Sequence, residues 1–549
     1  MKYVGLCTLA IVVAALSFTY RFNALGGTLG GFDNDEFVHL MRSNMILHGE
    51  QPLRDFRDGE LRGAWPSLSY AVPAWAQRIG GENLLSEAYL TVGALTLAYV
   101  MTFVLAAELS NRWWVGLLAA MDAIATTPKL YNYPKVLMLA LGAVAMRAVV
   151  VNPTWARLGF AAAVTAVAVL FRHDYGVYVA AAVLAGLVIR DGPQWRAAVR
   201  DVARYGGMTA VLLMPSAAWI KRYRGIVTYV RDSVAATGLE TSRTQLRLPQ
   251  VNASSWLSGD GLLTTTYYAF WAVLGVTSAV LAARAFRAES RLTVVERGTA
   301  AGLLAMAAIA NVFFLRANLS QRFGDAIIPV VLLAAWSVGA AGGFSSRAVR
   351  AAATAVPVAL LLGIFGSAYV YADVARDVGT SGLSDSWAKT MMRFRAARDE
   401  LRMLPPENAA WSDGLAEGTG RAARYIAECT SPDDYLLVGG YAPEIPVFAR
   451  RRFAAGQPTL SLSFYTSVED QEQAIAKLRT QSVPVVLVPL QGTEEDFSDD
   501  YPLIARYVTD RYREAGIIEV EGERRIRVFV EANRQPRRMD PHLGLPCFK

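Results

Sequence analysis

Apolar stretches alternate with short polar segments over the first two thirds of the chain. Most of them approach the length of about 17 to 25 residues that a helix needs to cross the roughly 30 Å hydrocarbon core of a membrane. We therefore predict a polytopic α-helical membrane protein with about eleven transmembrane helices. The predicted spans cover residues 3–20, 87–108, 113–128, 134–150, 157–171, 175–189, 204–220, 265–283, 298–315, 325–341 and 350–371.

The pattern changes near residue 385, where the long apolar stretches end. Short buried-strand patterns cover residues 435–438 and 485–488, helical spacing covers 468–478, and residues 517–530 have the pattern of a hairpin. This alternation predicts a soluble α/β domain in which helices cover a small sheet. The sequence contains no G-x-G-x-x-G and no P-loop motif, so nothing here indicates a bound nucleotide, and no cofactor is predicted.

These patterns divide the chain into a transmembrane bundle, residues 1–371, and the α/β domain, residues 372–549. Arginines set the orientation, because basic residues concentrate in the cytoplasmic loops of membrane proteins. With a cytoplasmic N-terminus, the acidic first loop at 21–86 and the α/β domain lie outside. A cleaved signal peptide is the alternative for residues 1–20, although no A-x-A site follows them. The arginines of the alternate, cytoplasmic loops are Arg112, Arg157, Arg190, Arg196, Arg200, Arg204, Arg284, Arg287, Arg291, Arg297, Arg347 and Arg350.

The composition agrees with a membrane protein. Hydrophobic residues make up 53% of the 549 positions, and the mean hydropathy is +0.27. The net charge of +7 reflects arginines in short loops, and no nucleic-acid-binding motif accompanies it. Cys429 and Cys547 could pair if their domain faces an oxidising compartment, or they could remain two separate thiols.

Three carboxylates, Asp33, Asp35 and Glu36, follow the first apolar stretch. Charged groups at the mouth of a membrane segment are costly unless they are solvated or functional, so these three are candidate catalytic residues. A structural alternative is that Asp33 and Glu36 form the capping box of an amphipathic interfacial helix of about 12 residues. That alternative does not account for Asp35.

The acidic segment 33–36, followed by an amphipathic stretch and then by segment 49–56, resembles the first external loop of membrane glycosyltransferases of the GT-C class. The resemblance is to the bacterial branch that includes protein mannosyltransferases, aminoarabinose transferases and Rgt-type galacturonosyltransferases. The sequence departs from the pattern of this class at Leu53 and Phe323, where such enzymes often have Tyr. It also lacks the acidic residue that is often found in their second external loop. Further similar stretches are residues 131–135, Gln321-Arg322-Phe323 before Ile327-Ile328-Pro329, and residues 431–451.

The resemblance implies a transferase that moves a hexose or pentose from a polyprenyl-phosphate donor to a glycan, lipid or protein of the cell envelope. It places this multi-pass enzyme in the bacterial inner membrane, among membrane lipids, with its α/β domain extracytoplasmic. Asp35 would be the catalytic base, with Glu36 and Asp33 beside it. Substrate contacts are predicted at His173, Asp174, Tyr131 and Tyr133.

The departing phosphate of such a donor needs cations to stabilise its charge. The predicted outer loops offer eight candidate cations: Arg54, Arg57, Arg62, Lys129, Lys135, Arg172, Arg316 and Arg322. Among them we name Arg322, Lys135, Arg172, Arg54 and Arg57 as donor-phosphate ligands. For each, contact with lipid headgroups is the alternative role.

Several alternatives remain open. Asp33, Asp35 and Glu36 could hold Mg²⁺ or Mn²⁺, but none of the four histidines has ligand spacing, and no metal site is predicted. Residues 172–175 could form only a mutually satisfied turn between two helices. A transporter or flippase of lipid-linked sugars, or a non-catalytic envelope scaffold, also fits the chain, although the repeated halves of a transporter are not seen.

Overall fold

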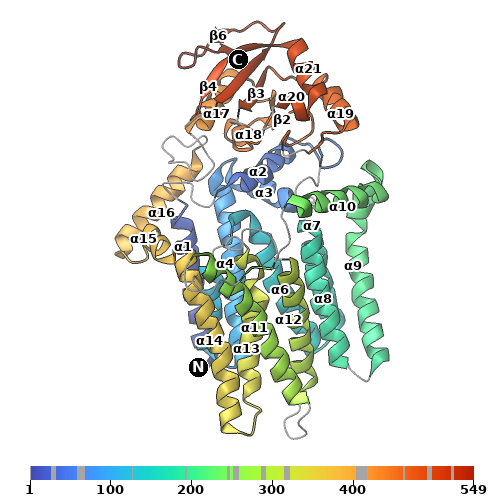
Figure 1. Cartoon of the computed structure of the whole chain (residues 1–549), viewed down its shortest axis with the longest axis vertical. Coiled ribbons are helices and arrows are strands. Elements are labelled where there is room, and N and C mark those ends of the chain that lie inside the picture. Colours follow the sequence, from blue (N-terminus) through green and yellow to red (C-terminus); the bar gives the residue numbers. More distant parts are fainter. Residues whose placement is uncertain are drawn as a thin grey trace. The chain divides into compact units, whose positions relative to one another are not determined.

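The described part of this computed structural model forms two compact units. The first contains residues 1–23 and 91–391, and the second contains residues 24–60, 67–90 and 392–549. Figure 1 colours the chain along its sequence. The described residues are 2–25, 32–57, 68–126, 128–191, 194–243, 248–250, 259–285, 292–313, 322–403, 417–461, 464–490, 497–520 and 525–549.

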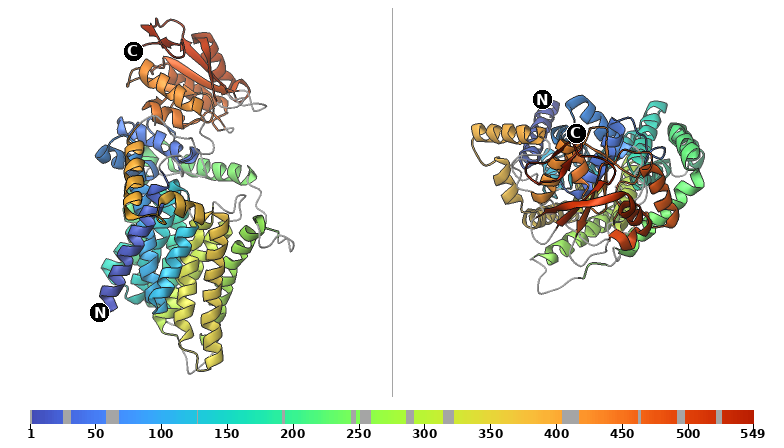
Figure 2. Two further views of the ribbon diagram at one scale, coloured as in Figure 1. Left: turned by 90° about the vertical axis from the view of Figure 1, so that its left-hand side faces the viewer. Right: turned by 90° about the horizontal axis from the view of Figure 1, so that it is seen from above.

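The first unit is a bundle of long helices that run alongside one another (Figure 1). A helix is present at each of the eleven predicted spans. The shorter α10, Ile226–Arg243, runs across the direction of its neighbour α9 in Figures 1 and 2. The helices at the predicted spans are α1 Lys2–Asn23, α4 Leu84–Ser110, α5 Trp113–Ala125, α6 Tyr133–Val151, α7 Trp155–Phe171, α8 His173–Asp191, α9 Trp195–Tyr223, α11 Asp260–Ala285, α12 Val294–Phe313, α13 Phe323–Ala341 and α14 Arg347–Tyr371.

Length and composition separate these helices into groups. Among the described residues, six helices are long and apolar enough to cross a membrane: Val4–Asn23, Leu84–Ser110, Leu130–Val151, Gly261–Ala285, Phe323–Ala341 and Arg347–Tyr371. Helices α5 and α7 are apolar but shorter. The expectation of a polytopic helical membrane protein is confirmed, whereas the number of about eleven spans stays a prediction.

The second unit contains the predicted α/β domain from residue 392 onward, whereas residues 372–391 belong to the first unit. Its five-stranded sheet has the order β2-β1-β3-β5-β4, in which β1 is parallel to β2 and β3, while β5 is antiparallel to β3 and β4. The predicted strands, the helix at 468–478 and the hairpin are all present. The strands are β1 Tyr435–Val438, β2 Arg452–Phe453, β3 Val485–Leu490, β4 Tyr512–Glu519 and β5 Arg525–Glu531, with a separate pair β6 Arg538–Met539 and β7 Pro546–Cys547.

Helices cover this sheet. Leu437 and Val486 contribute to a core that also contains Leu478 of α19 and Ile504 of α21. Burying these aliphatic side chains contributes roughly 1.5 to 3 kcal/mol each. The helices after the bundle are α15 Val374–Ser381, α16 Trp387–Arg402, α17 Glu417–Cys429, α18 Glu444–Ala449, α19 Val468–Leu478, α20 Phe497–Asp500 and α21 Pro502–Arg511.

Part of the predicted acidic loop packs within this second unit. Helices α2, Asn34–Leu47, and α3, Leu68–Gly80, contact each other, and α2 also contacts α18 and β2. The Phe37 and Phe448 rings lie 5.0 Å apart, edge to face. The interfacial location of α2 stays a prediction. Protein surrounds most of this helix, and even the charged side chain of Arg42 is buried.

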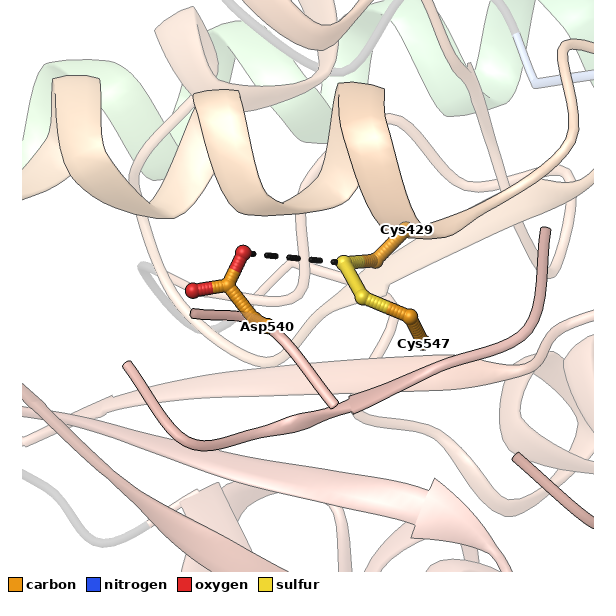
Figure 3. Close-up of side chains that lie close together, drawn as sticks. All are labelled: Cys429, Asp540 and Cys547. Carbon is orange, nitrogen blue, oxygen red and sulfur yellow. Dashed lines mark hydrogen bonds between the residues drawn. A yellow bond between two sulfur atoms is a disulfide. The ribbon is translucent and has the colours of Figure 1, made fainter. Parts of the chain in front are cut away.

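A disulfide joins Cys429, the last residue of α17, to Cys547 of β7, across 118 positions of the sequence (Figure 3). Asp540 lies beside it, with Oδ2 at 3.8 Å from Sγ of Cys429. The chain-entropy model assigns a loop of this length roughly 4 to 5 kcal/mol of stabilisation. Of the two alternatives that the sequence left open for these cysteines, the structure has the paired one.

Candidate functional site

The N-terminus of α2 carries the three predicted carboxylates, and each has a different role. Asp33 is the N-cap, since its Oδ1 accepts a hydrogen bond from the backbone N–H of Glu36 at 3.1 Å. A side-chain cap of this kind stabilises a helix by about 1 kcal/mol. The capping role proposed for Asp33 is therefore present in the structure.

Asp35 makes a long-range contact. The hydroxyl of Tyr441 donates a hydrogen bond to Oδ1 of Asp35 at 3.1 Å. Tyr441 belongs to the segment between β1 and α18, so an element of the α/β domain fixes the carboxylate. Asp35 is half-buried. A half-buried, oriented carboxylate can accept a proton from a substrate group in its vicinity.

Glu36 meets a fourth carboxylate, Glu87, in the first turn of α4. Both side chains are about 1% exposed, and a hydrogen bond joins them. Burial, followed by the nearby Glu87 carboxylate, raises the pKa of Glu36 well above its usual value. Two buried carboxyl groups joined by a hydrogen bond share a proton more readily than they both ionise. We call Asp33, Asp35, Glu36 and Glu87 the acidic cluster.

A second set of charges lies in the helical bundle. Lys135 Nζ is 3.0 Å from Oδ2 of Asp325, and Arg322 Nη1 is 3.7 Å from the same oxygen. Arg172 binds Asp174 through two hydrogen bonds, each of 2.8 Å. We call these five residues the cationic cluster.

The ring of Tyr175 links the two halves of the cationic cluster. Lys135 Nζ is 5.2 Å from its centroid, and the guanidinium carbon of Arg172 is 5.1 Å from it. Cations at such distances from an aromatic face are attracted to it. Three of the five predicted phosphate ligands are thus brought together.

The other two predicted phosphate ligands lie in the second unit and already bind carboxylates. Arg54 binds Asp55 through Nε and Nη2, at 2.8 and 2.6 Å. Arg57 binds Asp470 and Gln473 of α19. The contacts of Arg57 hold the segment at 49–57 to the α/β domain, whereas the Arg54–Asp55 pair lies within the segment. Arg62 and Arg316, named with them among the eight loop cations, lie outside the described residues.

The predicted substrate residues are distributed around the cationic cluster. Tyr131 is buried, with Lys129 Nζ at 5.7 Å from its ring. Tyr133 packs edge to face on Phe171. His173 begins α8, and its ring contacts Tyr229. Asp174, as described, holds Arg172, which agrees with the turn between α7 and α8 that the sequence predicted.

Sequence reasoning did not name Glu87, Asp325 or Tyr441. Glu87 and Asp325 carry a visible signal, because each is an acid within an otherwise apolar helix, where ionisable residues are rare and functional. Tyr441 carries no such signal in the sequence. Its partner Asp35 lies 406 positions away in the sequence.

Metal ligands converge at one place among the described residues. Cys429, Asp540 and Cys547 present ligand atoms within 4.8 Å of one another. The two sulfur atoms are already joined to each other, as Figure 3 shows, so thiolate ligation is excluded in this state. As they are placed, Asp33, Asp35 and Glu36 do not form such a group within the described part of the chain.

Comparisons with known proteins gave similarity to solved structures. No protein-family model matches the chain, and no curated protein matches it. Among solved structures, the chain is similar to ArnT from Cupriavidus metallidurans in the apo state. The two are 13% identical, with a TM-score of 0.49, over 96% of this chain and 98% of that one.

Proposed function

We propose that this protein is a membrane glycosyltransferase of the GT-C type, which moves a sugar from a polyprenyl-phosphate donor to an acceptor of the cell envelope. The acceptor would be a lipid, a glycan or a protein, and transfer would occur at the outer face of the inner membrane. The observation that carries the proposal is the oriented carboxylate of Asp35 at the start of α2.

Asp35 would act as the general base. Sugar transfer to a hydroxyl requires removal of its proton as the new bond forms, and a positioned base contributes roughly 10²- to 10⁴-fold to such a rate. The hydrogen bond from Tyr441 fixes the direction of the Asp35 carboxylate. Glu36 is bound to Glu87, so it would support the site without accepting the proton.

The cationic cluster would stabilise the phosphate that leaves. Lys135, Arg172 and Arg322 are largely buried, and charge-assisted contacts gain strength when water is excluded. A polyprenyl phosphate combines an anionic head with an apolar chain, which suits cations placed at the ends of apolar helices.

The disulfide supports an outer location for the α/β domain. Disulfides persist in oxidising compartments and are rare in the cytosol. This agrees with the orientation predicted from the arginines of the alternate loops. A periplasmic α/β domain would place Asp35 on the side where envelope acceptors are found.

The test is turnover by the purified full-length chain with a panel of undecaprenyl-phosphate-linked sugars and envelope extract, read as release of undecaprenyl phosphate. Asp35→Asn nearly keeps the side-chain shape, so we expect release to fall by at least about a hundredfold. The control is Asp433→Asn, an exposed acid of the α/β domain. Wild-type turnover in Asp35→Asn would refute Asp35 as the base. Absence of turnover by the wild-type chain would leave the transporter or scaffold as the better hypothesis.

A further inference from the structure

The N-termini of three helices are linked at the cationic cluster. Lys135 is the third residue of α6, Asp174 and Tyr175 lie in the first turn of α8, and Asp325 lies in the first turn of α13. A helix N-terminus carries a partial positive charge and N–H groups without intrahelical partners. Three such termini around one group of cations define a strongly anion-attracting site.

These helix ends lack the usual side-chain caps. The N-cap of α6 is Asn132 and that of α13 is Arg322, and neither side chain accepts a capping hydrogen bond. The N-cap side chains therefore occupy none of the first N–H groups of these helices, although the N–H groups of Tyr133 and Asp325 donate to the backbone carbonyls of Leu130 and Arg322. Asn132 lies one turn before Lys135, which places the two on the same side.

Several buried polar atoms at this position have no hydrogen-bond partner in the described part of the chain. They are the hydroxyl of Tyr175, both side-chain polar atoms of Asn132, Nε of Arg322 and Oδ1 of Asp325. Tyr175, Asn132 and Asp325 are each at least nine-tenths buried. Because buried polar groups are nearly always paired, several unpaired ones in one place indicate a ligand.

Asp325 occupies the centre of this arrangement. One of its oxygens bridges Lys135 and Arg322, and the side chain is 2% exposed. A carboxylate and a phosphate ester make the same kind of contact with a lysine, an arginine and a helix N-terminus. The phosphate has more acceptor oxygens, which the Tyr175 hydroxyl, the Asn132 amide and Arg322 Nε could satisfy.

We propose that Asp325 is a placeholder for the phosphate of a polyprenyl-phosphate ligand. In the unliganded protein, the Asp325 carboxylate occupies the position that this phosphate takes when the ligand binds. On binding, the phosphate replaces Asp325 as the partner of Lys135 and Arg322, and Tyr175 supplies a further hydrogen bond. Tyr175 is then a specificity residue: its hydroxyl acts only in the bound state, whereas its ring contacts Lys135 and Arg172 in the unliganded protein. This inference rests on the proposed donor class. It adds that the phosphate of the donor displaces the Asp325 carboxylate from Lys135 and Arg322.

The test is equilibrium binding of undecaprenyl phosphate, and separately of inorganic phosphate, to the full-length chain in nanodiscs. Tyr175→Phe keeps the ring that contacts Lys135 and Arg172 and removes only the hydroxyl. We expect about tenfold weaker binding of undecaprenyl phosphate, the loss of one hydrogen bond to a charged group, with an unchanged melting temperature. The matched control is Tyr99→Phe, whose buried hydroxyl also has no partner among the described residues, and which should bind as wild type does.

Asp325→Asn tests the placeholder itself. Removing the competing charge should strengthen binding of undecaprenyl phosphate by about tenfold if the variant folds. Weaker binding to a folded Asp325→Asn variant, or wild-type binding by Tyr175→Phe, would overturn the inference. If Asp325→Asn does not fold, Tyr175→Phe decides alone.

The two proposals fail in different ways. If the wild-type chain binds no undecaprenyl phosphate, the donor class of the proposed function is refuted. If it binds normally and the variants do not differ from it, the donor class stands and the placeholder is refuted. Binding of inorganic phosphate alone would identify a free anion as the ligand and would overturn the lipid-phosphate assignment.

Discussion

The hydroxyl of Tyr441 lies 3.1 Å from Oδ1 of Asp35 and joins the α/β domain to the first residues of α2. Tyr441 follows Gly439 and Gly440 and precedes Pro443 by two positions. Glycine and proline favour a turn here, so the turn after β1 does not depend on the Tyr441 side chain. The hydroxyl is therefore the part that this contact requires. It acts on the candidate base.

Tyr441→Phe should slow transfer. Without the donor, the Asp35 carboxylate loses the contact that fixes its direction. We expect the turnover rate to fall severalfold, much less than for Asp35→Asn. The control is Tyr435→Phe, which removes a hydrogen bond of 2.7 Å to Glu50. That variant should affect stability and leave the turnover rate unchanged; equal decreases in both would contradict the role of Tyr441.

Glu36 should make the protein less stable as pH rises. The folded protein holds a proton on Glu36 at pH values where the unfolded chain has lost it, because burial and then Glu87 raise the pKa of this carboxyl. The unfolded state then binds fewer protons, so the free energy of unfolding falls from the usual carboxyl pKa upward. Glu36→Gln should flatten this dependence and raise the melting temperature at pH 8.

Melting curves between pH 5 and pH 9 in detergent would measure this effect for wild type, Glu36→Gln and Glu428→Gln. Glu428 is exposed on α17, so its replacement should leave the slope unchanged. A wild-type stability that does not vary with pH, or a slope that survives in Glu36→Gln, would show that another group is responsible.

The five predicted phosphate ligands should separate into two groups when each is changed to Ala. Lys135, Arg172 and Arg322 lie in the cationic cluster, so their loss should weaken binding of polyprenyl phosphate by several kcal/mol. Arg54 is partly exposed, and Arg57 binds Asp470, so their loss should cost roughly 1 kcal/mol or less. Binding to detergent-purified chain measures both groups, and equal effects in all five would argue against a specific site.

The disulfide gives a second measure of orientation. Reporter fusions after Arg200 should report the cytoplasm, and fusions after Asp433 should report the outer side. Cys547→Ser should lower the stability of the α/β domain by roughly 2 to 5 kcal/mol, whereas Cys7→Ser, an exposed position in α1, should not change it. Free Cys429 and Cys547 thiols in freshly isolated membranes would argue for a cytoplasmic domain.

Local pattern was sufficient for most elements of this fold. A helix occupies 468–478 and a strand occupies 435–438, because apolar spacing within one segment decides both. Pattern could not reveal that α2 is buried, since that depends on α18 and β2. It also could not pair Lys135 with Asp325, which are 190 positions apart. The capping role of Asp33 was visible because it depends on residues within one helical turn.

The long separation between Asp35 and Tyr441 has a consequence for how the protein is made. Helix α2 is synthesised early, but α18 and β2, on which it packs, follow after the whole bundle. During that interval the apolar face of α2 lacks its final cover, which is the situation in which nascent chains associate wrongly or meet chaperones. The candidate base receives its tyrosine partner only after the whole bundle has been made, so a chain that ends before β1 would contain every helix of the bundle and lack the hydroxyl that orients Asp35.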